Sequence, residues 1–141
     1  MAKIMIIDDD IELTDIRAVF LRNEGHTVVT SDTADGAIEK LLVSKPDLLI
    51  LDVMFPENSI AGFELARKIR KVHELEGLPI IMMTGVNDYV PMDLPTGDPE
   101  HDCMPVQDFI DKPVELKELL SRINQLLNLP SKPESNAVAA P

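Results

Sequence analysis

Residues 3–10 read KIMIIDDD: four apolar side chains follow Lys3, and three aspartates, Asp8, Asp9 and Asp10, follow them. A short continuous apolar run that ends in polar residues is typical of a strand buried on both faces of a parallel sheet. Two further runs have the same form, LLIL at 48–51 and IIMM at 80–83. Weaker strand patterns lie at 27–30 and 109–111. Together these segments predict the strands of one sheet.

Between and after these strands, apolar residues recur at the spacing of an α-helix. Gly25, Lys45-Pro46 and the region of Gly77 end the first three of these segments. Strand alternating with helix indicates right-handed crossovers and a parallel sheet covered on both sides, so we expect a five-stranded, doubly wound α/β domain. The four apolar stripes are Leu13, Ile16, Val19 and Phe20; Ala37, Ile38, Leu41 and Leu42; Phe63, Ala66, Ile69 and Val72; and Leu116, Leu119, Leu120, Ile123, Leu126 and Leu127.

Two regions depart from this alternation. Residues 86–107 contain prolines at 91, 95, 99 and 105 and no apolar stripe at helical spacing. Because proline removes a hydrogen-bond donor and disfavours helix in the residue before it, we expect the fourth helix to be short or replaced by loop. Residues 130–141 have too few large apolar groups to offset the entropy of ordering them. The sequence therefore predicts a domain at 1–129 and a flexible tail at 130–141.

Length and charge exclude several classes of protein. A chain of 141 residues suits one domain, and no apolar run approaches the roughly 20 residues needed to span a bilayer. The net charge of -12 repels phosphate backbones, so we expect no nucleic-acid partner. No leader pattern precedes Lys3, and a single Cys103 cannot form an internal disulfide, which agrees with a reducing compartment. We expect a cytoplasmic protein without a membrane partner.

Polar side chains follow the predicted strands where ligands bind in open parallel sheets, at the carboxyl ends. The first run ends in Asp8 to Asp10, the third in Asp52, the fourth in Thr84, and the fifth in Lys112-Pro113 after Asp111. Carboxylates that repel one another form a site for a hard cation such as Mg²⁺. One carboxylate can then act as a nucleophile toward phosphorus, while a lysine and a hydroxyl stabilise the phosphoryl oxygens. The set therefore indicates phosphoryl transfer.

The segments KIMIIDDD, LLILDVMFP followed by GFEL, IIMMTG and DFIDKP occur in this order, and the sequence resembles the receiver domain of two-component response regulators. The resemblance covers about nine-tenths of the chain, and its specificity lies in the combination of motifs. It implies a flavodoxin-like strand order, 2-1-3-4-5. It also implies a phosphoprotein of a phosphorelay, with a histidine kinase or phosphotransfer protein as donor.

The resemblance assigns a role to each matched residue. It makes Asp52 the phosphoacceptor, Asp9 a direct Mg²⁺ ligand, Asp8 a ligand through water, and the backbone carbonyl of Met54 a further ligand, beside Asp52 itself. Thr84 and Lys112 would bind the phosphoryl group. Thr84 and Phe109 would act as the switch, and the bond before Pro113 would be cis.

The resemblance also implies the kind of regulator. We expect a domain that is not a conventional enzyme but catalyses its own phosphorylation and dephosphorylation. It would signal as a single domain by protein–protein contact, to a downstream protein that the sequence does not identify, as a monomer or weak dimer. Two departures bear on this expectation: the enlarged segment Glu57 to Ala61 beside the acceptor, and the long stretch between Thr84 and Lys112. The second implies a rebuilt readout surface.

Other interpretations stay open. Asp10 fits a helix cap better than a metal ligand, and Phe109 fits core packing as well as a switch. The chain could be a pseudo-receiver, which keeps the fold as a non-switching interaction module. It could also be a haloacid dehalogenase-type phosphatase, in which Asp8 of the Asp8-x-Asp10 pattern is the nucleophile. Against this reading, Glu12 stands where that family has Thr or Val.

Overall fold

Five parallel strands form one sheet in the order β2-β1-β3-β4-β5, in a computed structural model that describes residues 2–52, 61–85 and 108–127. This confirms the predicted fold class and strand order. The expected fourth helix within 86–107 and the expected tail at 130–141 lie outside the described residues. The strands are β1 (Lys3–Ile7), β2 (Thr27–Ser31), β3 (Leu48–Asp52), β4 (Ile80–Thr84) and β5 (Asp108–Asp111).

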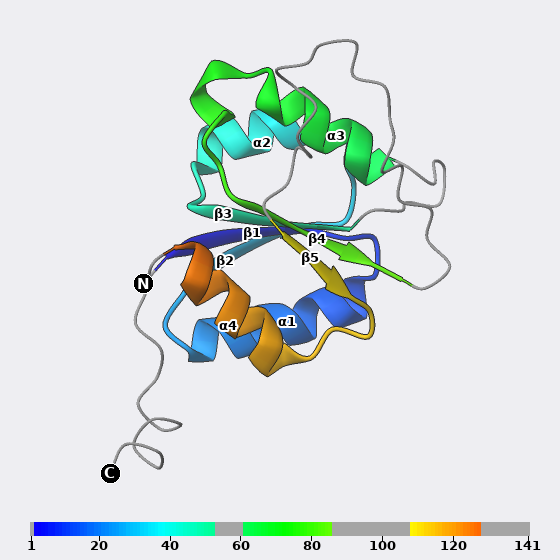
Figure 1. Cartoon of the computed structure of the whole chain (residues 1–141), viewed down its shortest axis with the longest axis vertical. Coiled ribbons are helices and arrows are strands. Elements are labelled where there is room, and N and C mark those ends of the chain that lie inside the picture. Colours follow the sequence, from blue (N-terminus) through cyan, green and yellow to red (C-terminus); the bar gives the residue numbers. More distant parts are fainter. Residues whose placement is uncertain (1, 53–60, 86–107, 128–141) are drawn as a thin grey trace.

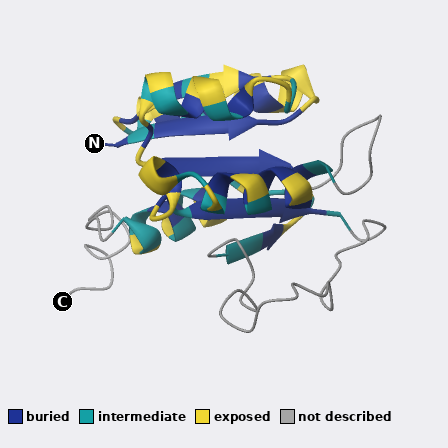
Figure 2. Ribbon diagram, turned by 90° about the horizontal axis from the view of Figure 1, so that it is seen from above, coloured by how far each residue is buried: buried dark blue, intermediate teal, exposed yellow. Residues whose placement is uncertain are grey.

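Helices cover both faces of the sheet (Figure 1): α2 and α3 pack on one face, and α1 and α4 on the other. β3 and β4 are buried at every residue and β1 at all but Lys3, so the centre of the sheet is dark blue in Figure 2. No helix of the described ranges is long and apolar enough to cross a membrane. The helices are α1 (Ile11–Asn23), α2 (Ala37–Ser44), α3 (Ala61–Arg70), the 3-10 turn η1 (His73–Leu75) and α4 (Leu116–Leu126).

The prediction of which face of α1 packs against the sheet was wrong. Leu13, Ile16 and Val19 are 44%, 54% and 54% exposed, and only Phe20 is partly buried against the core. The stripes predicted for the other helices do pack against the sheet; Leu41, Ile69 and Ile123, for example, are fully buried. A row of apolar side chains therefore lies on the outside of α1.

The buried face of α1 consists of Thr14, Arg17, Ala18 and Leu21. Relative to the predicted stripe, the helix is turned by about 100°, the rotation of one residue. Ala18 and Leu21 join the core between α1, α4 and the sheet. The same rotation points Arg17 toward Asp8, to which it is hydrogen-bonded. Turning the apolar row inward would remove that buried carboxylate's charged partner, which is strongly destabilising.

Asp10 begins α1 as the sequence predicts. Its backbone is extended, with φ -84° and ψ 96°, and its side chain accepts a hydrogen bond from the Leu13 N–H at 3.1 Å. This N-cap satisfies one of the free amides of the first turn. The Asp10 side chain therefore caps α1, while its backbone N–H donates to Asp8 Oδ1.

An arginine from a flanking helix reaches each edge strand. Arg22 of α1 donates to the Val28 carbonyl of β2 at 2.9 Å, and Arg122 of α4 donates to the Phe109 carbonyl of β5 at 2.6 Å. The Thr27 N–H and the Ser31 carbonyl form hydrogen bonds toward β1. The backbone groups of the alternate residue Val28 therefore point away from β1, toward the open edge of the sheet. At the other edge, the Lys112 backbone N–H donates to the Thr84 carbonyl of β4. By the same alternation, the backbone groups of Phe109 point away from β4, toward the open edge.

Which face of α1 packs can be tested with two substitutions. Leu21→Ala removes a fully buried side chain and should lower the free energy of unfolding by about 2–5 kcal/mol. Ile16→Ala changes a half-exposed side chain and should change the same quantity by about 0.5 kcal/mol or less. Urea denaturation followed by circular dichroism measures both. Equal losses for the two variants would show that the outer row is packed.

Candidate functional site: an acid cluster at the carboxyl edge of the sheet

Three carboxylates meet where β1 and β3 end. In the register of these parallel strands Ile7 pairs with Leu51, so Asp8 and Asp52 follow side by side. One oxygen each of Asp8, Asp9 and Asp52 lies within 4.8 Å of the others. Asp8 and Asp52 are both 2% exposed, whereas Asp9 is exposed. The structure thus brings together the three aspartates that the sequence singled out, and we call them the acid cluster.

Lys112 reaches the acid cluster from the end of β5. Its ammonium donates to Asp52 Oδ1 at 2.6 Å, and its backbone N–H donates to the Thr84 carbonyl at 2.7 Å. The backbone bond fixes the residue beside β4, and the peptide bond to Pro113 is cis. A charge-assisted hydrogen bond of this length to a buried carboxylate places a cation against the candidate nucleophile.

Thr84 and Phe109 lie on the neighbouring strands. Thr84 is 7% exposed, and its hydroxyl donates to Asp111 Oδ1 at 3.4 Å, a long hydrogen bond. The Phe109 ring lies 6.1 Å from that of Phe63 in α3, between centroids, and packs against the core on that side of the sheet. Thr84 is thus placed at the edge that carries Asp52, while Phe109 takes part in core packing.

Asp8 has two donors of its own. Its Oδ1 accepts from the Asp10 backbone N–H at 3.0 Å, and its Oδ2 accepts from Arg17 Nη1 at 2.9 Å. Sequence reasoning missed Arg17 because apolar residues lie on two faces of α1. The available signal is the spacing Thr14, Arg17, Ala18 and Leu21, which is equally helical and presents an arginine to the acid run.

The surroundings raise the pKa values of Asp52 and Asp9. Burial raises the pKa of Asp52 to about 6; the charges of Asp8 and Asp9 add to this, and the hydrogen bond from Lys112 opposes it. Burial and the charge of Asp8 also raise the pKa of Asp9. In both cases the charged form is disfavoured, and a bound cation would favour it.

The acid cluster fits a hard divalent cation. Its three carboxylate oxygens lie close enough to share one ion, and oxygen is the ligand type that Mg²⁺ selects. Asp9 is exposed and has no cation within ion-pair distance among the described residues, so it is available to an ion arriving from solvent. The predicted fourth ligand, the carbonyl of Met54, lies outside the described residues.

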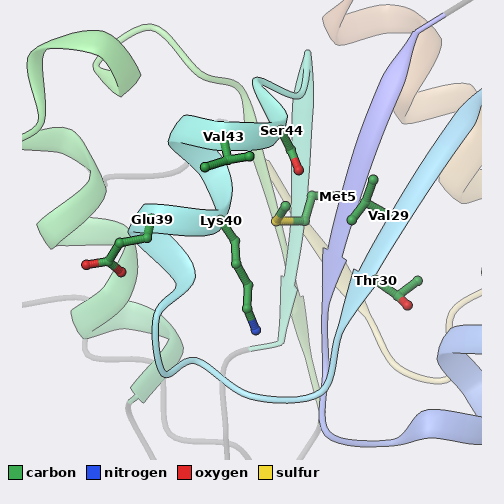
Figure 3. Close-up of a pocket in the computed structure, with 7 residues that line it drawn as sticks. All are labelled: Met5, Val29, Thr30, Glu39, Lys40, Val43 and Ser44. Carbon is green, nitrogen blue, oxygen red and sulfur yellow. The ribbon is translucent and has the colours of Figure 1, made fainter.

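A hollow elsewhere in the fold is a weaker candidate for chemistry. A cavity of about 270 Å³ lies between α2 and the strands β1 and β2 (Figure 3). Glu39 and Lys40 are its charged lining residues, and it contains no member of the acid cluster. We therefore assign the chemistry to the sheet edge.

Comparison with known proteins finds regulatory proteins among the relatives of this chain. The sequence pattern of the response regulator receiver domain matches residues 4–124. The chain is 34% identical over 136 residues to the transcriptional regulatory protein CpxR homolog of Haemophilus influenzae, covering 96% of this chain and 55% of that protein. It is 38% identical over 125 residues to the regulatory protein VanR of Enterococcus faecium, covering 89% and 49%. The chain spans about half the length of these curated relatives.

Solved structures agree with the sequence relatives. The receiver domain of NtrX from Brucella abortus superposes with a TM-score of 0.71 and 26% identity, covering 89% of this chain and 98% of that one. The chemotaxis protein CheY4 of Vibrio cholerae gives a TM-score of 0.72 and 25% identity, with the same coverage.

The raised pKa of Asp52 predicts how the stability of the metal-free protein depends on pH. Since the folded-state pKa of about 6 exceeds the ordinary 3.8, the folded protein retains a proton that the unfolded chain loses. Stability should therefore fall as pH rises from about 4 to 6 and stay reduced above that range. Asp52→Asn removes the cost of ionising this buried carboxyl group. It should raise the free energy of unfolding by about 1–3 kcal/mol at pH 7.5 in EDTA, but not below about pH 4.

Urea denaturation at both pH values measures this effect. Asp35→Asn, which neutralises an exposed carboxylate, is the matched control and should change stability little. An Asp52→Asn protein that is no more stable than the wild type at pH 7.5 would contradict the prediction.

Proposed function

The chain belongs to the response regulator receiver family, and on this premise we propose that it accepts a phosphoryl group on Asp52 from a histidine kinase or phosphotransfer protein, in a Mg²⁺-dependent step of a two-component phosphorelay. One observation carries the assignment of the acceptor: Asp52 is nearly fully buried, touches the ammonium of Lys112 at 2.6 Å, and shares the acid cluster with Asp8 and Asp9. A receiver of this kind works in the cytoplasm, where ATP-dependent kinases supply phosphoryl groups.

In the proposed step, a carboxylate oxygen of Asp52 attacks the phosphorus of a phosphohistidine. The new O–P bond forms as the P–N bond breaks, and the imidazole leaves with that electron pair. Lys112 neutralises the phosphoryl oxygens, and the Thr84 hydroxyl gives up its long contact with Asp111 to donate to one of them. Asp8, Asp9 and Asp52 would hold Mg²⁺, which would supply further neutralisation of charge on the transferring group.

Loss of the phosphoryl group reverses the signal. Water attacks the phosphorus of the acyl phosphate, the O–P bond to Asp52 breaks, and inorganic phosphate and the free carboxylate result. The domain thus catalyses its own phosphorylation and dephosphorylation, with Asp52 as a nucleophile that is restored in each cycle. Its output is protein–protein contact with a downstream partner.

The outer face of α1 supports delivery by a protein donor. α1 begins at Ile11, three residues after Asp8, and its first exposed apolar residues, Ile11 and Leu13, therefore lie near the edge that carries the acid cluster. A partner that brings phosphohistidine to Asp52 must approach this edge, and burying such side chains would favour its docking.

The acceptor can be tested with small phosphodonors. Incubation with acetyl phosphate and Mg²⁺ should give a phosphorylated species by intact mass, and beryllofluoride with Mg²⁺ should shift amide NMR signals around Thr84. Asp52→Asn should abolish both responses, and Lys112→Ala should weaken them, because the phosphoryl oxygens lose their cation. Asp10→Asn is the matched control: it removes a carboxylate from the same acid run but retains a capping oxygen, and it should react like the wild type.

Two outcomes would overturn the proposal. An adduct that survives Asp52→Asn and maps to Asp8 would favour the haloacid dehalogenase-type phosphatase. No adduct and no shifts near Thr84 would favour the non-switching pseudo-receiver.

A further inference from the structure

Arg17 is a second cation of the acid cluster. Its Nη1 lies 2.9 Å from Asp8 Oδ2, and the two side chains are 5% and 2% exposed. It approaches from α1, whereas Lys112 approaches Asp52 from the end of β5. The two cations therefore touch two different carboxylates of the same cluster.

The charges in the cluster do not balance around a divalent ion. Three carboxylates and two cations, all ionised, leave one negative charge, and the exposed Asp9 is the carboxylate without an ion pair among the described residues. Without Arg17 the remaining groups would carry two negative charges, which matches Mg²⁺. Because the Arg17–Asp8 pair is buried, water and salt screen its charge poorly.

Asp8 is also held in place by these contacts. Both of its oxygens accept hydrogen bonds from the chain, one from the Asp10 N–H and one from Arg17. A carboxylate with both oxygens engaged is less free to turn toward an ion than Asp9 is.

We propose that Arg17 is a built-in counter-ion of the metal site: it orients Asp8 and weakens Mg²⁺ binding. This inference rests on the proposed Mg²⁺ site. Arg17 is a positioning residue, because it acts through Asp8. The alternative is that the ion pair only stabilises the packing of α1 against the end of β1. In that case, replacing Arg17 would lower stability but would not change the affinity for Mg²⁺.

The test compares Mg²⁺ binding by wild type, Arg17→Met and Arg17→Lys, using amide NMR titration with MgCl₂ at constant ionic strength. Arg17→Met keeps much of the side chain's length without charge, and it should bind Mg²⁺ about tenfold or more tightly, since one positive charge leaves the cluster. Arg17→Lys restores the charge and should bind nearly like the wild type. Thermal unfolding adds a second readout: Mg²⁺ should raise the Tm of Arg17→Met more than that of the wild type.

Asp8→Asn in the Arg17→Met background removes the unpaired carboxylate and should abolish the gain in affinity. If Arg17→Met is not folded in EDTA, all the proteins are titrated in trimethylamine N-oxide, which favours the folded state. A folded Arg17→Met protein with wild-type or weaker affinity for Mg²⁺ would overturn the inference. A wild-type protein that binds no Mg²⁺ would instead overturn the proposed site itself, so the two failures are distinguishable.

Discussion

Crowding of negative charge at the end of a parallel sheet is the constraint on which this structure depends. Because β1 and β3 are adjacent and in register, Asp8 and Asp52 lie side by side with little access to water. Burying two such charges is costly unless each is paired. Arg17 from α1 and Lys112 from the end of β5 supply these partners. The orientation of α1 and the turn after β5 are therefore both set by the need to place a cation beside a buried carboxylate.

Much of the fold could be predicted from the sequence because the strands are continuous apolar runs. Residues 48–51 and 80–83 have no polar side chain to expose, so they fit only the centre of a covered sheet. The strand ends then locate the acid cluster, because parallel strands terminate at a common edge. The capping role of Asp10 was also predictable, since a single helix start needs a single cap.

The orientation of α1 could not be predicted in the same way. Leu13 and Ile16 form as regular a stripe as Ala18 and Leu21 do, and hydrophobicity alone favours the more apolar of the two. The stripe that packs is the one containing Arg17, because a buried carboxylate nine residues earlier in the sequence needs a cation. That choice depends on a tertiary contact, which periodicity does not describe. The arginine was missed together with the face that carries it.

The arginines on the two edge strands have a consequence for how copies of the chain meet. An open sheet offers unpaired backbone groups at each edge, and these can template a strand from another molecule. Arg22 and Arg122 already occupy outward carbonyls of β2 and β5, so an incoming strand would first have to displace a charged side chain at either edge. A net charge of -12 adds general repulsion between copies, so the fold resists growth into longer intermolecular sheets.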